Sequence, residues 1–78
     1  MWKSVNGYEG YYEVNEFGVV RSLDRYIERS DGTVQLRKAR EMTQWENRDG
    51  YLTVKLSRDG VSQRIPVHRL VGMAFVDV

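Results

Sequence analysis

Alternation of hydrophobic and polar residues is clearest over residues 51–57, between two Arg-Asp-Gly turns. A period of two predicts a strand with one face on a core and the other face in water. The predicted core face consists of Leu52, Val54 and Leu56, and the predicted wet face of Tyr51, Thr53, Lys55 and Ser57. The Asp59-Gly60 step is a strong hairpin signal, so residues 61–67 supply the partner strand. Pro66 belongs at an edge or strand end, because proline cannot donate to a ladder.

The spacing of apolar residues becomes helical after Pro66. The apolar positions are Val67, Leu70, Val71, Ala74 and Phe75. They predict a short helix from about residue 68 to residue 75, with its apolar stripe packed on the sheet. A helix of two turns is not stable alone, so it depends on that packing.

A second hairpin is predicted nearer the N-terminus. Residues 10–14 and 19–23 are rich in Tyr and Val, which suit strands, and Asn15-Glu16-Phe17-Gly18 makes a plausible loop between them. Residues 24–40 allow two interpretations. They form either two strands around Ser30-Asp31-Gly32 or one long mobile loop.

These elements predict an α+β fold. We expect a small antiparallel β-sheet of hairpins, with about 4–6 strands, and a short C-terminal helix packed on it. The 78 residues make one domain. We divide it into an N-terminal hairpin (1–23), a variable basic insert (24–47), a second hairpin (48–67) and the helix (68–76). A core of this size is marginal, which leaves a homodimer open.

The net charge of +1 conceals an uneven distribution. Residues 1–20 hold one Lys against three Glu, which sums to −2. Residues 37–69 hold eight Lys or Arg against four Asp or Glu, which sums to +4. A basic second half is typical of a nucleic-acid face, although a mixed, solvated surface explains the same numbers.

The inventory of reactive side chains predicts no enzyme. The chain has no cysteine and one histidine, His68, so a closed zinc site is excluded and no nucleophile pattern is present. We expect no catalytic residue, no metal and no cofactor. No apolar run approaches the roughly 18 residues that span a membrane, so we expect a cytoplasmic protein without a membrane partner. Trp2 and Trp45 are expected to be core or lid aromatics, in preference to the alternative of base-stacking platforms, because large aromatic side chains dominate small cores.

Two motifs cover most of the chain. The first reads Trp2-Lys3-x-Val5-x-Gly7-Tyr8-Glu9-Gly10-x-Tyr12-Glu13-Val14-Asn15-x-x-Gly18-x-Val20-Arg21-Ser22. The second reads Gly50-Tyr51-Leu52-x-Val54-x-Leu56, followed by Val67-His68-Arg69-Leu70-Val71-x-x-Ala74-Phe75. In this order they resemble the nuclease-associated modular domain that opens many phage and intron-encoded HNH homing endonucleases.

The resemblance implies an antiparallel β module that lies on DNA. In that family the pattern continues into an Asp-His pair and spaced asparagines, which hold one divalent metal ion. No such continuation follows Val78, so we expect a phage- or prophage-encoded module that stops before the HNH metal site. His68 corresponds to the family's helix-start histidine and not to its catalytic one.

Two functions follow as hypotheses. The favoured one is a non-catalytic module that binds double-stranded DNA through a basic sheet face. Its candidate nucleic-acid-binding residues are Arg37, Lys38, Arg40, Tyr51, Lys55, Arg58, Arg64 and Arg69. The alternative is a phage-encoded inhibitor of a host defence system, of anti-CRISPR or anti-restriction type, that binds a host protein or a small signalling ligand.

Overall fold

The computed structural model describes residues 1–75, which form eight strands and one helix. The first sheet contains β1 (Trp2–Ser4), β2 (Tyr12–Asn15) and β3 (Val20–Ser22). A separate hairpin contains β4 (Arg25–Glu28) and β5 (Val34–Arg37). The last sheet contains β6 (Gln44–Glu46), β7 (Leu52–Arg58) and β8 (Val61–Pro66), and α1 (Val67–Phe75) follows it. All strand pairs are antiparallel.

The α+β class is confirmed, but the expected single sheet of about 4–6 strands is wrong. Within the described residues the strands number eight and belong to three sheets. The additional strands, β1 and β6, have three residues each and lie at sheet edges. Segments this short contain too few residues to show an alternation, so the sequence pattern does not mark them.

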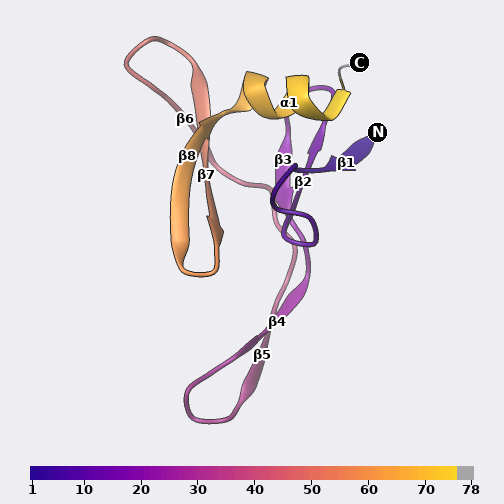
Figure 1. Ribbon diagram of the computed structural model, residues 1–78, viewed down its shortest axis with the longest axis vertical. Helices are drawn as coiled ribbons and strands as arrows, with labels where there is room; N and C mark the ends of the chain where they lie inside the picture. Colours follow the sequence, from indigo (N-terminus) through magenta and orange to yellow (C-terminus); the bar gives the residue numbers. More distant parts are fainter. Residues whose placement is uncertain (76–78) are drawn as a thin grey trace.

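The core lies where the two three-stranded sheets meet under α1 (Figure 1). Val14 and Val20 from the first sheet and Val54 and Leu56 from β7 are fully buried. On α1, Val67 and Leu70 are buried, and the remaining apolar positions of the predicted stripe are partly buried against them. The predicted helix is therefore confirmed, while its extension to residue 76 falls outside the described residues. Each buried Val or Leu side chain stabilises the fold by about 1.5–3 kcal/mol.

The predicted faces of β7 are correct at their centre and wrong at their start. Leu52 is 51% exposed, because it lines a shallow apolar hollow beside α1 instead of entering the core. Thr53 was expected in water but is buried, and its hydroxyl donates to the Trp45 carbonyl oxygen at 2.9 Å. This hydrogen bond satisfies the buried hydroxyl, so the polar residue is tolerated there.

The turns follow from Asp, Asn and Gly. Asp59 and Gly60 both have positive φ, 53° and 80°, as the two-residue turn between β7 and β8 requires. Gly18 closes the β2–β3 loop with φ 84°, and a Cβ there would lie 3.4 Å from Val67 Cγ1. Pro66 ends the edge strand β8, as predicted.

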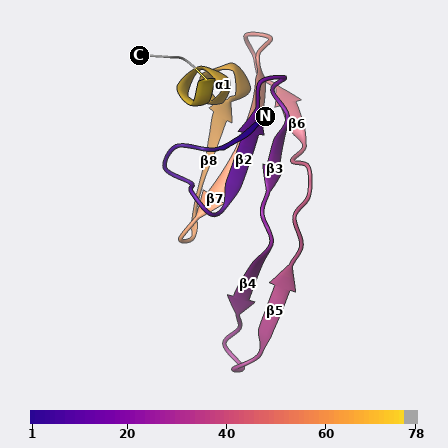
Figure 2. The ribbon, with the colours of Figure 1, turned by 90° about the vertical axis from the view of Figure 1, so that its right-hand side faces the viewer.

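The β4–β5 hairpin projects from the rest of the fold along the longest axis of the molecule (Figures 1 and 2). The molecule measures 42 × 29 × 19 Å. Because β4 and β5 pair in an antiparallel ladder, the prediction of two strands in residues 24–40 is confirmed, and the alternative of one long loop is wrong. After β5 the chain returns beside β3, where the Ser22 N–H donates to the Arg40 carbonyl oxygen and the Met42 N–H to the Val20 carbonyl oxygen, both at 2.8 Å.

The Tyr12 hydroxyl joins the two larger sheets. It accepts the Ser57 N–H at 3.1 Å and donates to the Ser57 carbonyl oxygen at 3.3 Å. On one side, β7 pairs with β8 over residues 53–58. On its other side, β6 pairs with β7 only at residues 52–54, so among the described strands none adjoins Ser57 on that side. Tyr12, which is 6% exposed, supplies the missing partner.

We expect Tyr12→Phe to lower the free energy of unfolding by about 1–3 kcal/mol, because the Ser57 backbone groups lose their partner. Urea denaturation followed by circular dichroism measures this change. The matched control is Tyr26→Phe at a side chain that is 74% exposed, which should leave stability unchanged. Equal stability of the two variants would contradict the role given to the Tyr12 hydroxyl.

Candidate nucleic-acid interface

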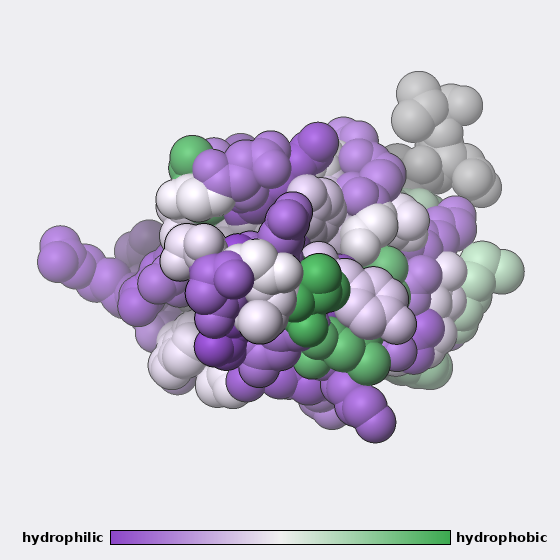
Figure 3. Space-filling view, turned by 90° about the horizontal axis from the view of Figure 1, so that it is seen from below, coloured by the Kyte–Doolittle hydropathy of each residue, from purple (hydrophilic) through white to green (hydrophobic). Residues whose placement is uncertain are grey.

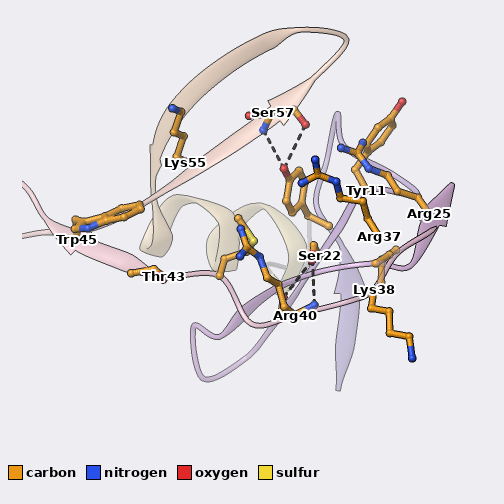
Figure 4. Close-up of a pocket in the computed structure, with 13 residues that line it drawn as sticks. Tyr11, Ser22, Arg25, Arg37, Lys38, Arg40, Thr43, Trp45, Lys55 and Ser57 are labelled. Carbon is orange, nitrogen blue, oxygen red and sulfur yellow. Dashed lines mark hydrogen bonds between the residues drawn. The ribbon is translucent and has the colours of Figure 1, made fainter. Parts of the chain in front are cut away.

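Five cationic side chains surround one hollow of about 360 Å³ between the first sheet, the base of the β4–β5 hairpin and β6–β7 (Figure 4). They are Arg25, Arg37, Lys38, Arg40 and Lys55. The remaining lining residues are polar, apolar or aromatic, and none is acidic. The hollow is therefore a site of concentrated positive charge on a chain whose net charge is only +1.

Strand register and local hydrogen bonds hold these cations in place. Arg25 lies directly opposite Arg37 in the β4–β5 ladder. The Ser22 hydroxyl accepts the Arg40 N–H at 3.1 Å, and the Asp24 carboxylate accepts the Ala39 N–H. The backbone between Arg37 and Arg40 is thus held at Arg37, Ala39 and Arg40, and Figure 4 shows the Lys38 side chain at the rim, extending away from the hollow.

Lys55 enters the hollow from the outer face of the last sheet. It lies directly opposite Arg64 of β8 in the β7–β8 ladder. On the same face, Trp45 lies opposite Thr53, and the Arg64 guanidinium lies 5.7 Å from the centre of the indole ring. Figure 4 shows Trp45 at one end of the hollow and Tyr11 with Arg25 at the other.

The cations of the hollow form no ion pairs with carboxylates within residues 1–75, whereas some arginines elsewhere do. Among the ion pairs formed within residues 1–75, Arg21 contacts Glu13 at 2.7 Å and Arg58 contacts Asp59 at 3.4 Å, but none includes a cation of the hollow. Arg25 lies over the Tyr11 ring at 4.9 Å, a contact that keeps its charge. Within residues 1–75, the cations of the hollow therefore form no ion pair with a carboxylate, although the Asp24 carboxylate lies beside them at the Ala39 N–H.

Two predicted site residues lie apart from the hollow, and a third, Arg58, lies at its Tyr11 end, with the guanidinium 5.5 Å from the centre of the Tyr11 ring. Tyr51 packs on His68 with ring centres 5.0 Å apart, beside α1. Arg69 is exposed on α1. Arg58 donates to the Gly7 carbonyl oxygen and lies near Glu9. The backbone N–H groups of Glu9 itself and of Gly7 hold the pKa of the Glu9 carboxyl below its ordinary value, and the Arg58 charge adds to this effect.

The structure brings together Arg37, Lys38, Arg40 and Lys55, with Arg64 beside them, and adds Arg25 and Trp45, which were not among the predicted site residues. Arg25 could have been found from the register, because a turn centred on Ser30–Gly32 places residue 25 opposite residue 37. Trp45 was considered from the sequence only as the less favoured alternative of a base-stacking platform, because the three residues of β6 show no alternation that would place its side chain.

Neither tryptophan belongs to the hydrophobic core, so the prediction of core aromatics is wrong for both. Trp45 is 46% exposed, and Trp2 is partly buried under the Arg21 guanidinium, 3.8 Å from its ring. Both residues belong to short strands at sheet edges, β1 and β6. A side chain on such a strand is not enclosed by the core, which explains their exposure.

The end of the molecule at the β4–β5 hairpin is mainly hydrophilic around a small hydrophobic patch (Figure 3). The exposed apolar and aromatic side chains of this hairpin are Tyr26, Val34 and Leu36. Tyr26 and Leu36 are paired across the ladder, on the face opposite to the Arg25–Arg37 pair. The hairpin therefore presents one basic face toward the hollow and one more apolar face away from it.

The described residues hold no group of three or more His, Asp or Glu side chains that could bind a metal ion. His68 is exposed in the first turn of α1, against Tyr51. Within the same part of the chain, no helix has the length and apolar character that crossing a bilayer requires.

Comparison with known proteins places the chain in a family. The NUMOD4 motif matches residues 1–57. The DNA endonuclease I-HmuI of Bacillus phage SP01 is 29% identical over 76 residues, which are 97% of this chain and 36% of the endonuclease. A solved structure described as "DNA binding and cleavage by the HNH homing endonuclease I-HmuI" matches with a TM-score of 0.71 and 31% identity. That match covers 96% of this chain and 36% of the other.

The chain thus spans about a third of the length of this relative and corresponds to its N-terminal part. The resemblance to the modular domain that opens HNH homing endonucleases is confirmed. By its sequence and by its fold, the chain belongs to the NUMOD4 motif family.

Proposed function

We propose that the chain is a non-catalytic module that binds double-stranded DNA through its basic hollow and the adjoining outer face of β6–β7–β8. The observation that carries the proposal is the gathering of five cations around one hollow with no acidic residue in its lining. Phosphate contacts from Lys and Arg supply most of the affinity of proteins for DNA, so such a surface is suited to a polyanion.

Like-charged pairs support the same proposal. Arg25 faces Arg37, and Lys55 faces Arg64, at directly opposed positions of two antiparallel ladders. Like charges at such positions destabilise a sheet, so the pairs oppose folding of the free protein. A phosphate bound between the members of a pair turns this repulsion into attraction.

The relative supports a DNA partner, since the endonuclease I-HmuI is described by its DNA binding and cleavage. The proposal of a non-catalytic role is supported by residues 1–75 themselves, in which no cluster of His, Asp or Glu side chains is placed to bind a metal ion. Inhibition of a host defence system, by contact with a host protein or a small ligand, stays a prediction from the sequence, as does a homodimer.

Removing one member of a like-charged pair should stabilise the free protein. We expect Arg37→Gln to raise the free energy of unfolding by about 0.2–1 kcal/mol at low salt. High salt screens the repulsion, so the gain should shrink there. Arg48→Gln is the control, because it removes the same charge from an exposed loop between β6 and β7. Urea titrations at two salt concentrations test this, and a destabilised Arg37→Gln variant would contradict the account.

Binding to duplex DNA should depend steeply on salt. With about five phosphate contacts, the slope of log K against log salt concentration should be about −4 to −5. The variant Arg37→Gln/Lys55→Gln should reduce the magnitude of this slope by about two. Fluorescence anisotropy with a labelled duplex measures both slopes.

The matched control for this titration is Arg48→Gln/Arg69→Gln. Both double variants change the net charge from +1 to −1, since each loses two positive charges. The control should keep a slope close to that of the unmodified chain. Equal losses in the two variants would contradict the location of the interface, and no binding at low salt would contradict DNA binding altogether.

A further inference from the structure

The lining of the hollow is amphiphilic, which indicates a ligand with both charge and an apolar ring. Beside the five cations, Leu23 and Met42 contribute apolar surface, and Trp45 contributes an indole. A site for bare phosphate needs cations and hydrogen-bond donors but no aromatic surface. The volume of about 360 Å³ lies within the range of pockets that bind small organic ligands.

The indole of Trp45 is positioned to act as a stacking platform. Its strand is fixed by pairing with β7 and by the hydrogen bond from the buried Thr53 hydroxyl to the Trp45 carbonyl oxygen. Arg64 lies over the ring at 5.7 Å, yet 46% of the residue remains exposed. By contrast, the Tyr11 ring at the other end of the hollow is approached by two guanidinium groups, those of Arg25 and Arg58.

An exposed indole cannot stack on a base inside an intact duplex, because neighbouring bases cover both faces of that base. It can stack on a base that is unpaired, terminal or turned out of the helix. We infer that the hollow binds one unstacked nucleotide of DNA, with the base on Trp45 and the flanking phosphates on Arg37, Arg40 and Lys55. This inference rests on the proposed DNA binding and specifies the form of DNA that is preferred.

The test compares a duplex with the same duplex carrying one unpaired nucleotide. Anisotropy titrations at fixed salt should give at least about fivefold tighter binding to the bulged duplex, the lower bound for stacking one base. A single strand of the same length should share the preference over the intact duplex. With 2-aminopurine as the unpaired base, stacking on the indole should quench its fluorescence when the unmodified protein is added.

Variants assign the preference to the indole. Trp45→Ala should lose the preference for the bulged duplex while retaining salt-dependent binding to the intact one, and Trp45→Phe should keep part of it. The control is Tyr51→Ala, which removes an exposed aromatic residue beside α1, outside the hollow. Thermal unfolding checks that each variant is folded, and the 2-aminopurine measurement on the unmodified protein does not depend on any variant.

The outcomes separate this inference from the proposed function. Equal affinity for bulged and intact duplexes, with unquenched 2-aminopurine, would overturn the inference and leave DNA binding in place. No binding to any of the DNA forms would overturn both. Free deoxyadenosine monophosphate serves as the last competitor. If it displaced the bulged duplex at micromolar concentration, the ligand would be a free nucleotide, and the assignment to DNA would be overturned.

Discussion

The contact between the Tyr12 hydroxyl and the Ser57 backbone bonds the first sheet to the last across their shared core, together with the Gln44 side-chain amide, which donates to the Gly18 carbonyl oxygen at 2.7 Å. Neither three-stranded sheet encloses a core alone, and α1 covers only one side of their junction. Tyr12 and Ser57 also line the basic hollow. This contact therefore helps to hold the N-terminal sheet, beside which the Arg40 segment lies, against the strand that carries Lys55.

The electrostatic character of the chain depends on position rather than on total charge. A net charge of +1 gives a weak field at long range, but five cations around one hollow create a strong local one. Some of the carboxylates that balance the total form ion pairs elsewhere, Arg21–Glu13 and Arg58–Asp59, while the Asp24 carboxylate accepts the Ala39 N–H beside the hollow. Two like-charged ladder pairs border this region, so the free protein is less stable than its sheet geometry allows.

The sequence was sufficient for the β2–β3 and β7–β8 hairpins and for the helix, because alternation, Asp-Gly and Asn-x-x-Gly turns and the helical apolar spacing are local signals. For residues 24–40 it left two strands and a long loop as alternatives. It was insufficient for β1 and β6, whose three residues form strands only because β2 and β7 are there to pair with. The hollow itself could not be predicted, since it depends on residues 40–42 returning beside β3 and on Tyr12 reaching β7. Lys55 was found as a wet-face residue, but Arg25, at the other end of the hollow, was not.

The central claim is that DNA contacts the hollow and not the apolar face beside α1. Two-dimensional nuclear magnetic resonance of the 9.2 kDa chain with an added duplex tests this residue by residue. The account predicts that amide shifts concentrate at Arg25, Arg37–Arg40, Trp45 and Lys55, and that the Trp45 indole N–H shifts with them. Shifts concentrated at Phe17, Tyr51 and His68, with the hollow unperturbed, would contradict it.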